Sequence, residues 1–463
     1  MERKITQTLI GWKSDPERRP LIITGCRQIG KTFSIKEFVS SEYRSYMYIN
    51  FEIQPDKKDL FKGNCSADEL ISRLILSENI RMYPGESAIV LDEIQACTEA
   101  YSALKPLSED KRFDIICSGS FLGINLDDDD DHLSPLGYAK IVQMTPMDFE
   151  EYLWAMGINK DLISDVRARV QNLERVDDYF HQAFTKHFRT YMVVGGMPAA
   201  VKTYAETKDY VKTSDVLQDI ISILKKDTGK YSRKAGRTKI NKCLDSIPRQ
   251  LSKENKRFVY SDVEKKKGVG RKTYGSALDW LKEAGLISLC NNLTEPNKPL
   301  SSKVVEDAFK VFMNDTGLLM ALMDACDPAD IVLRDPYSNN GAMMECAVAS
   351  ALVKKKYPLY YYSKPDSTLE IDFVIESEGT PILMEVKSGR NKRAKSMITL
   401  MSEKSRKRRG CKIMDSNIEV DEHGIIHLPL YAPCFFKEVT VSEIPEPPSA
   451  DELNRRFLQN SDA

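Results

Sequence analysis

The chain has 463 residues, of which 42% are hydrophobic and 29% are charged, and its formal net charge is −1. These values are typical of a globular protein of about three domains, and no apolar run is long enough to cross a bilayer. The balanced charge excludes a uniformly basic protein, so a site for nucleic acid must come from local clusters of charge. The N-terminus has no secretory apolar region, and we expect a cytoplasmic location and no membrane partner.

The ten cysteines are scattered along the chain, without a CxxC pair or a neighbouring pair of histidines. This spacing indicates neither a zinc site nor a disulfide framework. We therefore expect reduced thiols that are mostly buried.

Residues 1–155 alternate apolar strands with helical segments, a pattern that is typical of a parallel α/β sheet. A run of five aspartates at 127–131 predicts a loop before the last strand. The expected strands are LIIT (21–24), YMYINF (46–51), AIVLD (88–92), FDIICS (113–118) and KIVQM (140–144).

The stretch GCRQIGKT, residues 25–32, fits the P-loop pattern GxxxxGK[ST] between the first strand and a helix that begins at Lys31. The loop backbone and the helix N-terminus would hold the β-phosphate of a nucleotide, Lys31 would reach its β and γ oxygens, and Thr32 would bind Mg²⁺. We expect Lys31 to be catalytic. The residues expected to contact the nucleotide are Gly25, Cys26, Arg27, Gln28, Ile29, Gly30, Lys31, Thr32, Phe33 and Ser118.

The third strand, AIVLD, ends in Asp92 and is followed by Glu93, at the carboxyl edge of the expected sheet. Asp92 would join the Mg²⁺ shell, and Glu93 would polarise the attacking water as a general base. The alternative is a chance glycine loop and a solvated strand end. The two halves stand in the order that a P-loop ATPase requires, which favours the nucleotide site.

Two further polar groups are candidates for the same site. Ser118 or Ser120, at the end of the fourth strand, would sense the γ-phosphate. Arg112, just before that strand, is a candidate arginine finger, although it fits an ordinary surface residue equally well.

Residues 156–248 are expected to form a helical linker, interrupted by a turn at VVGGMP (193–198). Residues 249–302 change to two short helices and a hairpin, which favours a winged helix. From 249 to 272 there are nine Lys or Arg against three acids. Such a module either presents a helix to DNA, with Lys272, Thr273 and Ser276 near bases or phosphates, or serves as a lid or subunit contact.

Residues 303–440 are expected to open with helices, to continue with strands and to end with a basic helix; residues 441–463 are expected to be a flexible tail. The strands LEIDFVIE and PILMEVKSG would pair as a hairpin closed by SEGT. Because alternate residues of a strand share a face, Asp372 would lie beside Glu385 and Lys387. The segment 392–412 has nine Lys or Arg against one acid, and it either holds a phosphate backbone or forms a solvated helix face.

Glu345 lies at the border of an apolar helical stripe, where a carboxylate is costly unless it is paired, exposed or bound to metal. Carboxylates that converge suit Mg²⁺, so Glu345, Asp372 and Glu385 are the expected metal ligands. Glu385 and Lys387 would be the catalytic residues, with Lys387 orienting water or stabilising charge at a phosphodiester. The alternative is a surface ion pair of Glu385 and Lys387, worth less than about 1 kcal/mol.

The chain resembles prokaryotic AAA-like P-loop ATPases with a C-terminal domain of uncharacterised function, over residues 3–390. One departure lies in CSGSFLGI, where Cys117 and Phe121 replace smaller or aliphatic residues and weaken the sensor assignment of Ser118. The motifs that carry the resemblance are PLIITGCRQIGKT, YINFE, IVLDEIQ, CSGSFLGI, TPMDFEEYLWAMG, GGMP, NDTGLL, GAMMECAVASAL, IDFVI and EVKSG.

The resemblance implies an α/β fold with a P-loop NTPase parallel-sheet domain, a helical linker and winged helix, and a C-terminal α/β unit similar to PD-(D/E)XK nucleases. It also implies ATP and Mg²⁺ as cofactors. We expect an ATP-hydrolysing protein coupled to a C-terminal domain that binds DNA and is a candidate to cleave it. The alternative is a nucleotide-gated signalling or interaction switch whose nuclease-like domain is inactive. Assembly into a homo-oligomer is left open.

Overall fold

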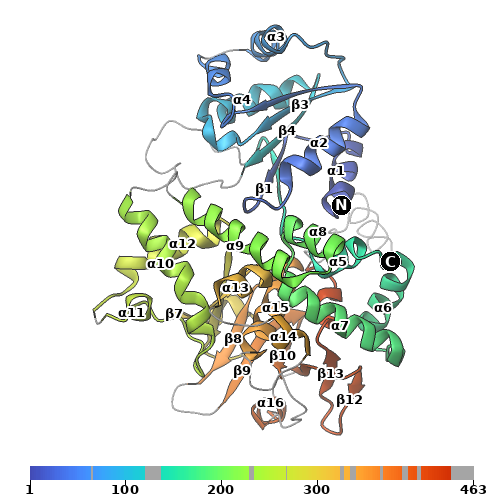
Figure 1. Cartoon of the computed structure of the whole chain (residues 1–463), viewed down its shortest axis with the longest axis vertical. Helices are drawn as coiled ribbons and strands as arrows, with labels where there is room; N and C mark the ends of the chain where they lie inside the picture. Colours follow the sequence, from blue (N-terminus) through green and yellow to red (C-terminus); the bar gives the residue numbers. More distant parts are fainter. Residues whose placement is uncertain are drawn as a thin grey trace, which may run out of the picture.

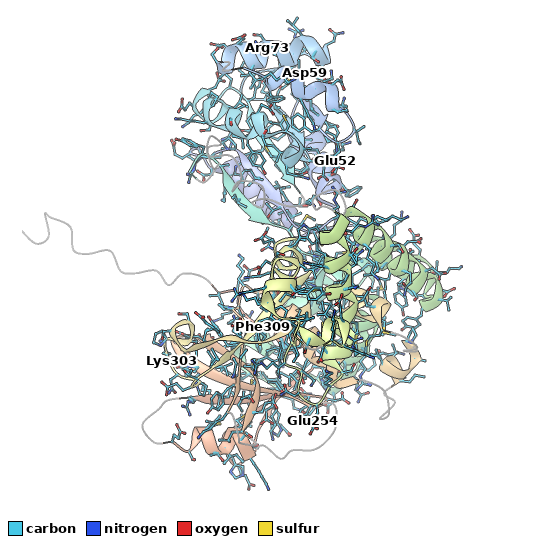
Figure 2. The ribbon with its side chains drawn as sticks, turned by 90° about the vertical axis from the view of Figure 1, so that its left-hand side faces the viewer. Glu52, Asp59, Arg73, Glu254, Lys303 and Phe309 are labelled. Carbon is cyan, nitrogen blue, oxygen red and sulfur yellow. The ribbon has the colours of Figure 1, made fainter. Side chains whose placement is uncertain are left out.

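The chain forms two lobes joined by a narrow waist, as Figure 2 shows. The upper lobe carries Glu52, Asp59 and Arg73, and the lower lobe carries Glu254 and Phe309. The computed structural model describes residues 1–63, 66–119, 137–228, 234–266, 268–323, 328–333, 340–364, 369–387, 395–403 and 408–439.

The upper lobe is built on a parallel sheet of five strands in the order β2-β3-β4-β1-β5. All five strands expected from the sequence are present, which confirms the parallel α/β sheet. The strands are β1 (Leu21–Thr24), β2 (Ser45–Asn50), β3 (Ser87–Asp92), β4 (Asp114–Gly119) and β5 (Lys140–Gln143). The α-helices of this part are α1 (Ile5–Ser14), α2 (Lys31–Glu42), α3 (Ala67–Glu78), α4 (Thr98–Asp110) and α5 (Phe149–Ala155).

The central strands read as continuous apolar runs because both faces of the sheet are covered. Every residue of β3 is buried, as is usual in parallel sheets. Along β1, Leu21 and Ile23 join the core beneath α1 and α2, whereas Ile22 joins the core beneath α3 and α4. The strand order places β1 between the central strand β4 and the edge strand β5, so the loop after β1 starts beside the end of β4 at the carboxyl edge.

Five helices follow along the chain. Figure 1 shows the N-terminal sheet at the top and the C-terminal sheet at the bottom. The expected turn at 193–198 is present, because α7 ends at Val194 and Pro198 is the first residue of α8. The predicted domain boundary at 248 falls inside the last of these helices. The helices are α6 (Lys160–Asn172), α7 (Asp178–Val194), α8 (Pro198–Thr207), α9 (Tyr210–Asp227) and α10 (Lys234–Leu251).

The next elements, together with α10, form a unit that we call the helical module: α11 (Ser261–Glu264), α12 (Arg271–Glu283) and the antiparallel hairpin of β6 (Ile287–Leu293) and β7 (Val304–Met313). This order of elements is the one expected of a winged helix, and that assignment stays a prediction. The hairpin is part of the C-terminal sheet, since β6 pairs in parallel with β8 (Tyr360–Ser363).

The prediction that residues 303–440 open with helices is wrong, because β7 occupies 304–313. The last six residues of β7, AFKVFM, are all buried. A short run that is buried on both faces has no alternation, so its sequence does not separate a strand from a helix. Pairing with β6 decided the outcome.

The lower lobe contains a mixed sheet of eight strands in the order β12-β13-β11-β10-β9-β8-β6-β7. The expected hairpin of β9 and β10 is present, while the basic segment 392–412 contains both a helix and a strand. The remaining strands are β9 (Glu370–Ser377), β10 (Thr380–Val386), β11 (Arg409–Met414), β12 (Glu419–Val420) and β13 (Ile426–Pro429). The remaining α-helices are α13 (Thr316–Leu322), α14 (Pro328–Leu333), α15 (Asn340–Lys354) and α16 (Lys395–Met401).

The eight cysteines within the described residues are free and buried, as expected from their spacing. No helix in the described part of the chain has the length and apolar character needed to span a membrane.

Candidate functional site

The loop of residues 25–30 connects β1 to α2 and has the backbone geometry of a phosphate cradle. Gly25 has φ +143° and Gly30 has φ +89°, values that L side chains rarely adopt. A Cβ at Gly25 would also collide with the carbonyl oxygen of Met144, at the end of β5. Gly30 is the N-cap of α2 and has no side chain to cap it, so the helix N-terminus is available to an anion.

Lys31 is the first residue of α2 and folds back into the loop. Its Nζ donates to the carbonyl oxygens of Gly25 and Cys26, at 2.8 Å each. The side chain is buried, and burial lowers the pKa of Lys31, while the negative charges of Asp92 and Glu93 act in the opposite direction. The lysine therefore holds the loop in shape and lies within the electrostatic reach of both acids.

Asp92 is the hub of the second half of the site. Its Oδ2 accepts hydrogen bonds from Thr32 Oγ1 (2.9 Å), Tyr48 OH (2.6 Å) and Asn50 Nδ2 (3.0 Å), and its Oδ1 accepts one from Ser118. Burial and the bond to Asp92 raise the pKa of Tyr48. The hydroxyl of Thr32 and the carboxylate of Asp92 are oxygen donors of the kind that Mg²⁺ takes, so the residues fit the expected ion.

Glu93 follows β3 in the left-handed region, with φ +53°. For a residue other than glycine this conformation is strained by about 1–2 kcal/mol, and such strain is common at functional sites. The side-chain amide of Gln95 donates to Glu93 Oε2 and orients the carboxylate. The charge of Glu93 acts on Lys31 of the loop, and its role as a general base stays a prediction.

The loop also contacts α9 and the helical module. Arg27 forms ion pairs with Glu52 (2.6 Å) and with Asp227, the last residue of α9 (3.1 Å). On the other side, a Cβ at Gly285, two residues after α12, would lie 3.6 Å from the backbone nitrogen of Cys26. A change in loop shape would thus be felt by α9 and by the helical module.

The other expected contact residues lie around the same loop. Ile29 is buried and its carbonyl oxygen accepts a hydrogen bond from Arg3 (2.6 Å). Gln28 has φ +66°, and Phe33, in the first turn of α2, is 57% exposed. Ser120 lies outside the described residues.

Two of the sequence assignments are refined by these contacts. Ser118 is fully buried and donates to Asp92, so it positions the acid. Arg112 lies at the opposite edge of the sheet, before β4, where it pairs with Asp110 (2.8 Å) and Asp68. Tyr48 and Asn50 were not among the residues expected at this site. The available signal was Asn50, a polar residue at the end of β2, the strand that pairs with β3.

Comparison with protein families assigns the upper lobe. Residues 17–153 match a family model described as an AAA domain. The N-terminal part of the chain is an AAA-like P-loop ATPase domain. Two further models match, each described as a domain of unknown function: DUF8612 over residues 185–328 and DUF4143 over residues 340–432. They leave the nuclease-like character of the lower lobe a prediction.

Among solved structures, the chain is similar to the Aeropyrum pernix Orc1 protein in complex with DNA, with 11% identity and a TM-score of 0.28 over 72% of this chain and 91% of that one. It is also similar to C. elegans PCH-2, with 14% identity and a TM-score of 0.21 over 38% of this chain and 49% of that one. Likenesses this low carry no argument about function. No curated protein matches the chain.

A buried polar junction ties the AAA domain to the lower lobe. Asp315, the N-cap of α13, accepts hydrogen bonds from the backbone N–H groups of Gly196 (2.6 Å) and Leu318 (3.0 Å). The carbonyl oxygen of Gly196 in turn accepts from the N–H of Met147, which follows β5 (2.7 Å). From the far side, Lys354 at the end of α15 donates to the carbonyl oxygen of Met147 (3.2 Å).

The junction lies close to the P-loop. Burial raises the pKa of the Cys26 thiol to about 12, and the charges of Lys31, Asp315 and Lys354 act on the same thiol. The helix α15 thus reaches from this junction to the acids of the lower lobe, since Glu345 lies nearer its other end.

Four acids meet in the lower lobe: Glu345, Glu370, Asp372 and Glu385, which we call the acid cluster. Met384 pairs with Phe373 across the β9–β10 hairpin, so the next residues, Glu385 and Asp372, are also neighbours. Asp372 Oδ2 accepts a hydrogen bond from the N–H of Val386 (2.8 Å), and Lys387 Nζ lies 3.3 Å from Glu385. Burial, followed by the charge of Asp372, raises the pKa of Glu345, and both effects also raise the pKa of Glu385.

Lysines from other elements neutralise this cluster. Lys256, in the connection between α10 and α11, pairs with Oε1 of Glu345, and Lys310 of β7 lies 4.0 Å from its Oε2 and 3.1 Å from Glu370. Lys412 of β11 is buried beside Glu385, its partner in parallel register. The sequence analysis missed all three lysines because they lie far from the acids along the chain.

The expected metal site of three acids is not assembled in this arrangement. Within the residues that the structure describes, no group of three or more His, Cys, Asp or Glu side chains is placed to hold a metal ion together. Asp372 and Glu385 come together as expected, whereas Glu345 is engaged by Lys256 and Lys310. The physical reason is that two ammonium groups, that of Lys310 buried and that of Lys256 partly buried, already neutralise this carboxylate.

Proposed function

We propose that the chain hydrolyses ATP at the P-loop and that the nucleotide state positions the helical module and the lower lobe on DNA. The hydrogen bond between Thr32 and Asp92 carries the first half of this proposal. It joins the end of the P-loop to the end of β3, as a site for nucleotide and Mg²⁺ requires. A chance glycine loop and a solvated strand end would not require this hydrogen bond.

In the proposed reaction Lys31 leaves the carbonyl oxygens of the loop and donates to the β and γ oxygens of the nucleotide. Mg²⁺, when bound by Thr32 and Asp92, would offset charge on the same phosphates. Glu93, oriented by Gln95, accepts the proton of the attacking water. Water attack breaks the γ-phosphate bond and releases ADP and phosphate.

Steady-state ATP hydrolysis by the full chain tests this function. Glu93→Gln should lower the rate about 10²- to 10⁴-fold while nucleotide still binds. Lys31→Ala should lose both binding and hydrolysis. Glu86→Gln is the matched control, because Glu86 is an exposed acid of the same lobe that pairs only weakly with Arg44. A Lys31→Ala protein that hydrolyses ATP at the original rate would refute the proposal.

Coupling to the rest of the chain is supported by the contacts of the loop. Arg27 reaches α9 through Asp227, and Cys26 lies against Gly285, between α12 and β6 of the helical module. Phosphates bound in the loop would compete for Arg27 and change both contacts. Hydrogen exchange of α9 and α12 with and without ATP measures the coupling.

DNA contact is supported by the basic groups of the helical module. Lys253, Arg257 and Arg271 line a hollow of about 700 Å³, and Lys272 is exposed on α12. Lys272, Thr273 and Ser276 stay the proposed contacts of that helix. Ion pairs such as Arg271 with Asp307 (3.2 Å) are exposed and worth less than about 1 kcal/mol, so phosphates can replace them.

The salt dependence of DNA affinity checks this contact. The logarithm of the DNA affinity should fall steeply and linearly with the logarithm of the salt concentration, and Arg271→Ala should reduce the magnitude of this slope by about 1. An affinity that is independent of salt would exclude the proposed phosphate contacts. The cytoplasmic location expected from the sequence stays a prediction, and assembly into a homo-oligomer, which the sequence left open, stays open.

Metal-dependent cleavage of DNA is a second candidate function, favoured by the pairing of Asp372 with Glu385 and the 3.3 Å contact to Lys387. Glu345 does not fit a shared cation while lysines hold it, so no cleavage step follows from this arrangement. The alternative is an inactive nuclease-like scaffold. Incubating the protein with DNA and Mg²⁺ or Mn²⁺ distinguishes the two. Cleavage that is lost in Lys387→Ala and kept in Lys364→Ala, an exposed control, supports the enzyme; no cleavage supports the scaffold.

A further inference from the structure

The two lysines on Glu345 differ in how they are held. Lys310 is on β7 with 2% of its side chain exposed; it also pairs with Glu370 and lies 4.8 Å from the ring centre of Tyr361. It is therefore part of the core. Lys256 comes from a connection of the helical module, and 19% of its side chain is exposed. Its long, flexible stem can withdraw without disturbing the sheet.

The backbone beside Lys256 is tied to β7. The N–H of Phe258 donates to the carbonyl oxygen of Phe309 (2.8 Å), and Arg257 bridges to Lys310. This short pairing delivers Lys256 to the acid cluster from the helical module. The same module touches the P-loop at Gly285, so one unit contacts both the nucleotide site and the acid cluster.

Glu345 is only half satisfied by these contacts. Its Oε1 pairs with Lys256, whereas its Oε2 is buried and accepts no hydrogen bond within the described part of the chain. A buried carboxylate oxygen without a donor is uncommon, because burial removes its water. This oxygen lies 4.0 Å from Lys310 Nζ, and the charge of Asp372 acts on the same carboxyl group.

We propose that the side chain of Lys256 is a removable plug that excludes a divalent cation from the acid cluster, and that its withdrawal from Glu345 opens the site. This inference rests on the second candidate function. Mg²⁺ and Mn²⁺ bind carboxylate oxygens directly, at about 2.0–2.1 Å for Mg²⁺, and the ammonium group on Oε1 takes that place. Its positive charge also repels a cation bound by Asp372 and Glu385.

Mn²⁺ titration of the full chain without nucleotide, followed by electron paramagnetic resonance, tests the plug. Lys256→Met keeps the apolar stem and removes the charge, and it should bind Mn²⁺ at least about tenfold more tightly than the wild type. Lys242→Met is the matched control, because Lys242 pairs with Glu264 on the surface of the same module and should leave Mn²⁺ affinity unchanged. Adding Glu345→Gln to Lys256→Met should abolish the gain.

The outcomes separate the plug from the function on which it rests. Equal Mn²⁺ affinity in the wild type and in Lys256→Met overturns the plug; if both then cleave DNA, the second candidate function survives alone. Tighter binding without cleavage supports the plug and rejects the nuclease. If no variant binds Mn²⁺, the plug is also overturned. Lys256→Gln, checked by circular dichroism melting, repeats the test if the methionine variant fails to fold.

Discussion

The junction between the AAA domain and the lower lobe offers a sharp test of the interactions described above. Asp315→Ala removes a fully buried carboxylate that accepts two backbone hydrogen bonds, from Gly196 (2.6 Å) and Leu318 (3.0 Å). It leaves both N–H groups without an acceptor and removes the N-cap of α13.

The expected loss of unfolding free energy in Asp315→Ala follows from the two hydrogen bonds that this carboxylate accepts. A hydrogen bond to a charged group contributes about 1.5–3 kcal/mol, and an N-cap contributes about 0.5–2 kcal/mol that overlaps with the bond to Leu318. Burial raises the pKa of Asp315, so ionisation offsets part of the gain. We expect Asp315→Ala to lower the free energy of unfolding of the lower lobe by about 3 kcal/mol. Asp315→Asn keeps one carbonyl acceptor and should lose about half as much.

Urea unfolding followed by circular dichroism measures these differences, and two transitions are expected because the chain has two lobes. Hydrogen exchange at the amide of Gly196 provides a local readout, since this N–H loses its acceptor in Asp315→Ala. Faster exchange there, with the AAA transition unchanged, would agree with the structure. An unfolding midpoint equal to that of the wild type, or equal loss in the Ala and Asn variants, would refute the hydrogen-bond account.

Three further changes test the P-loop. Gly25→Ala should abolish ATP binding and lower the melting temperature, because the added Cβ would collide with Met144 at a φ of +143°. Gly11→Ala is the control: its Cβ would enter open space on α1, and the change should raise the free energy of unfolding by about 0.5–1 kcal/mol. Thermal melting and binding of a fluorescent nucleotide measure both effects. Thr32→Val should remove the Mg²⁺-dependent part of ATP affinity with little change in melting temperature, which titrations with Mg²⁺ and with chelator compare. Asp227→Asn should weaken the ion pair with Arg27 by about 1 kcal/mol and speed hydrogen exchange at the end of α9; unchanged exchange would argue against that contact.

The sequence alone determined the features that depend on neighbouring residues. Apolar runs predicted the strands of the AAA domain, most clearly β1, β3 and β4, because a strand buried on both faces needs mostly apolar residues, whereas β5 is largely exposed. The P-loop followed from glycines at positive φ and a lysine at the start of a helix. The hairpin of β9 and β10 followed from alternation and a short turn, which brought Asp372 beside Glu385.

Only the tertiary structure decided which charged and polar groups distant in the sequence contact one another. Arg27 and Asp227 are 200 residues apart, Gly196 and Asp315 are 119 apart, and Lys256 and Glu345 are 89 apart. Nothing in the local pattern of a lysine indicates which buried carboxylate it will meet, because that choice depends on how sheets and helices pack. The same reason explains why β7 was misread, and why the acid cluster, though correctly assembled at Asp372 and Glu385, has lysines where a cation was expected.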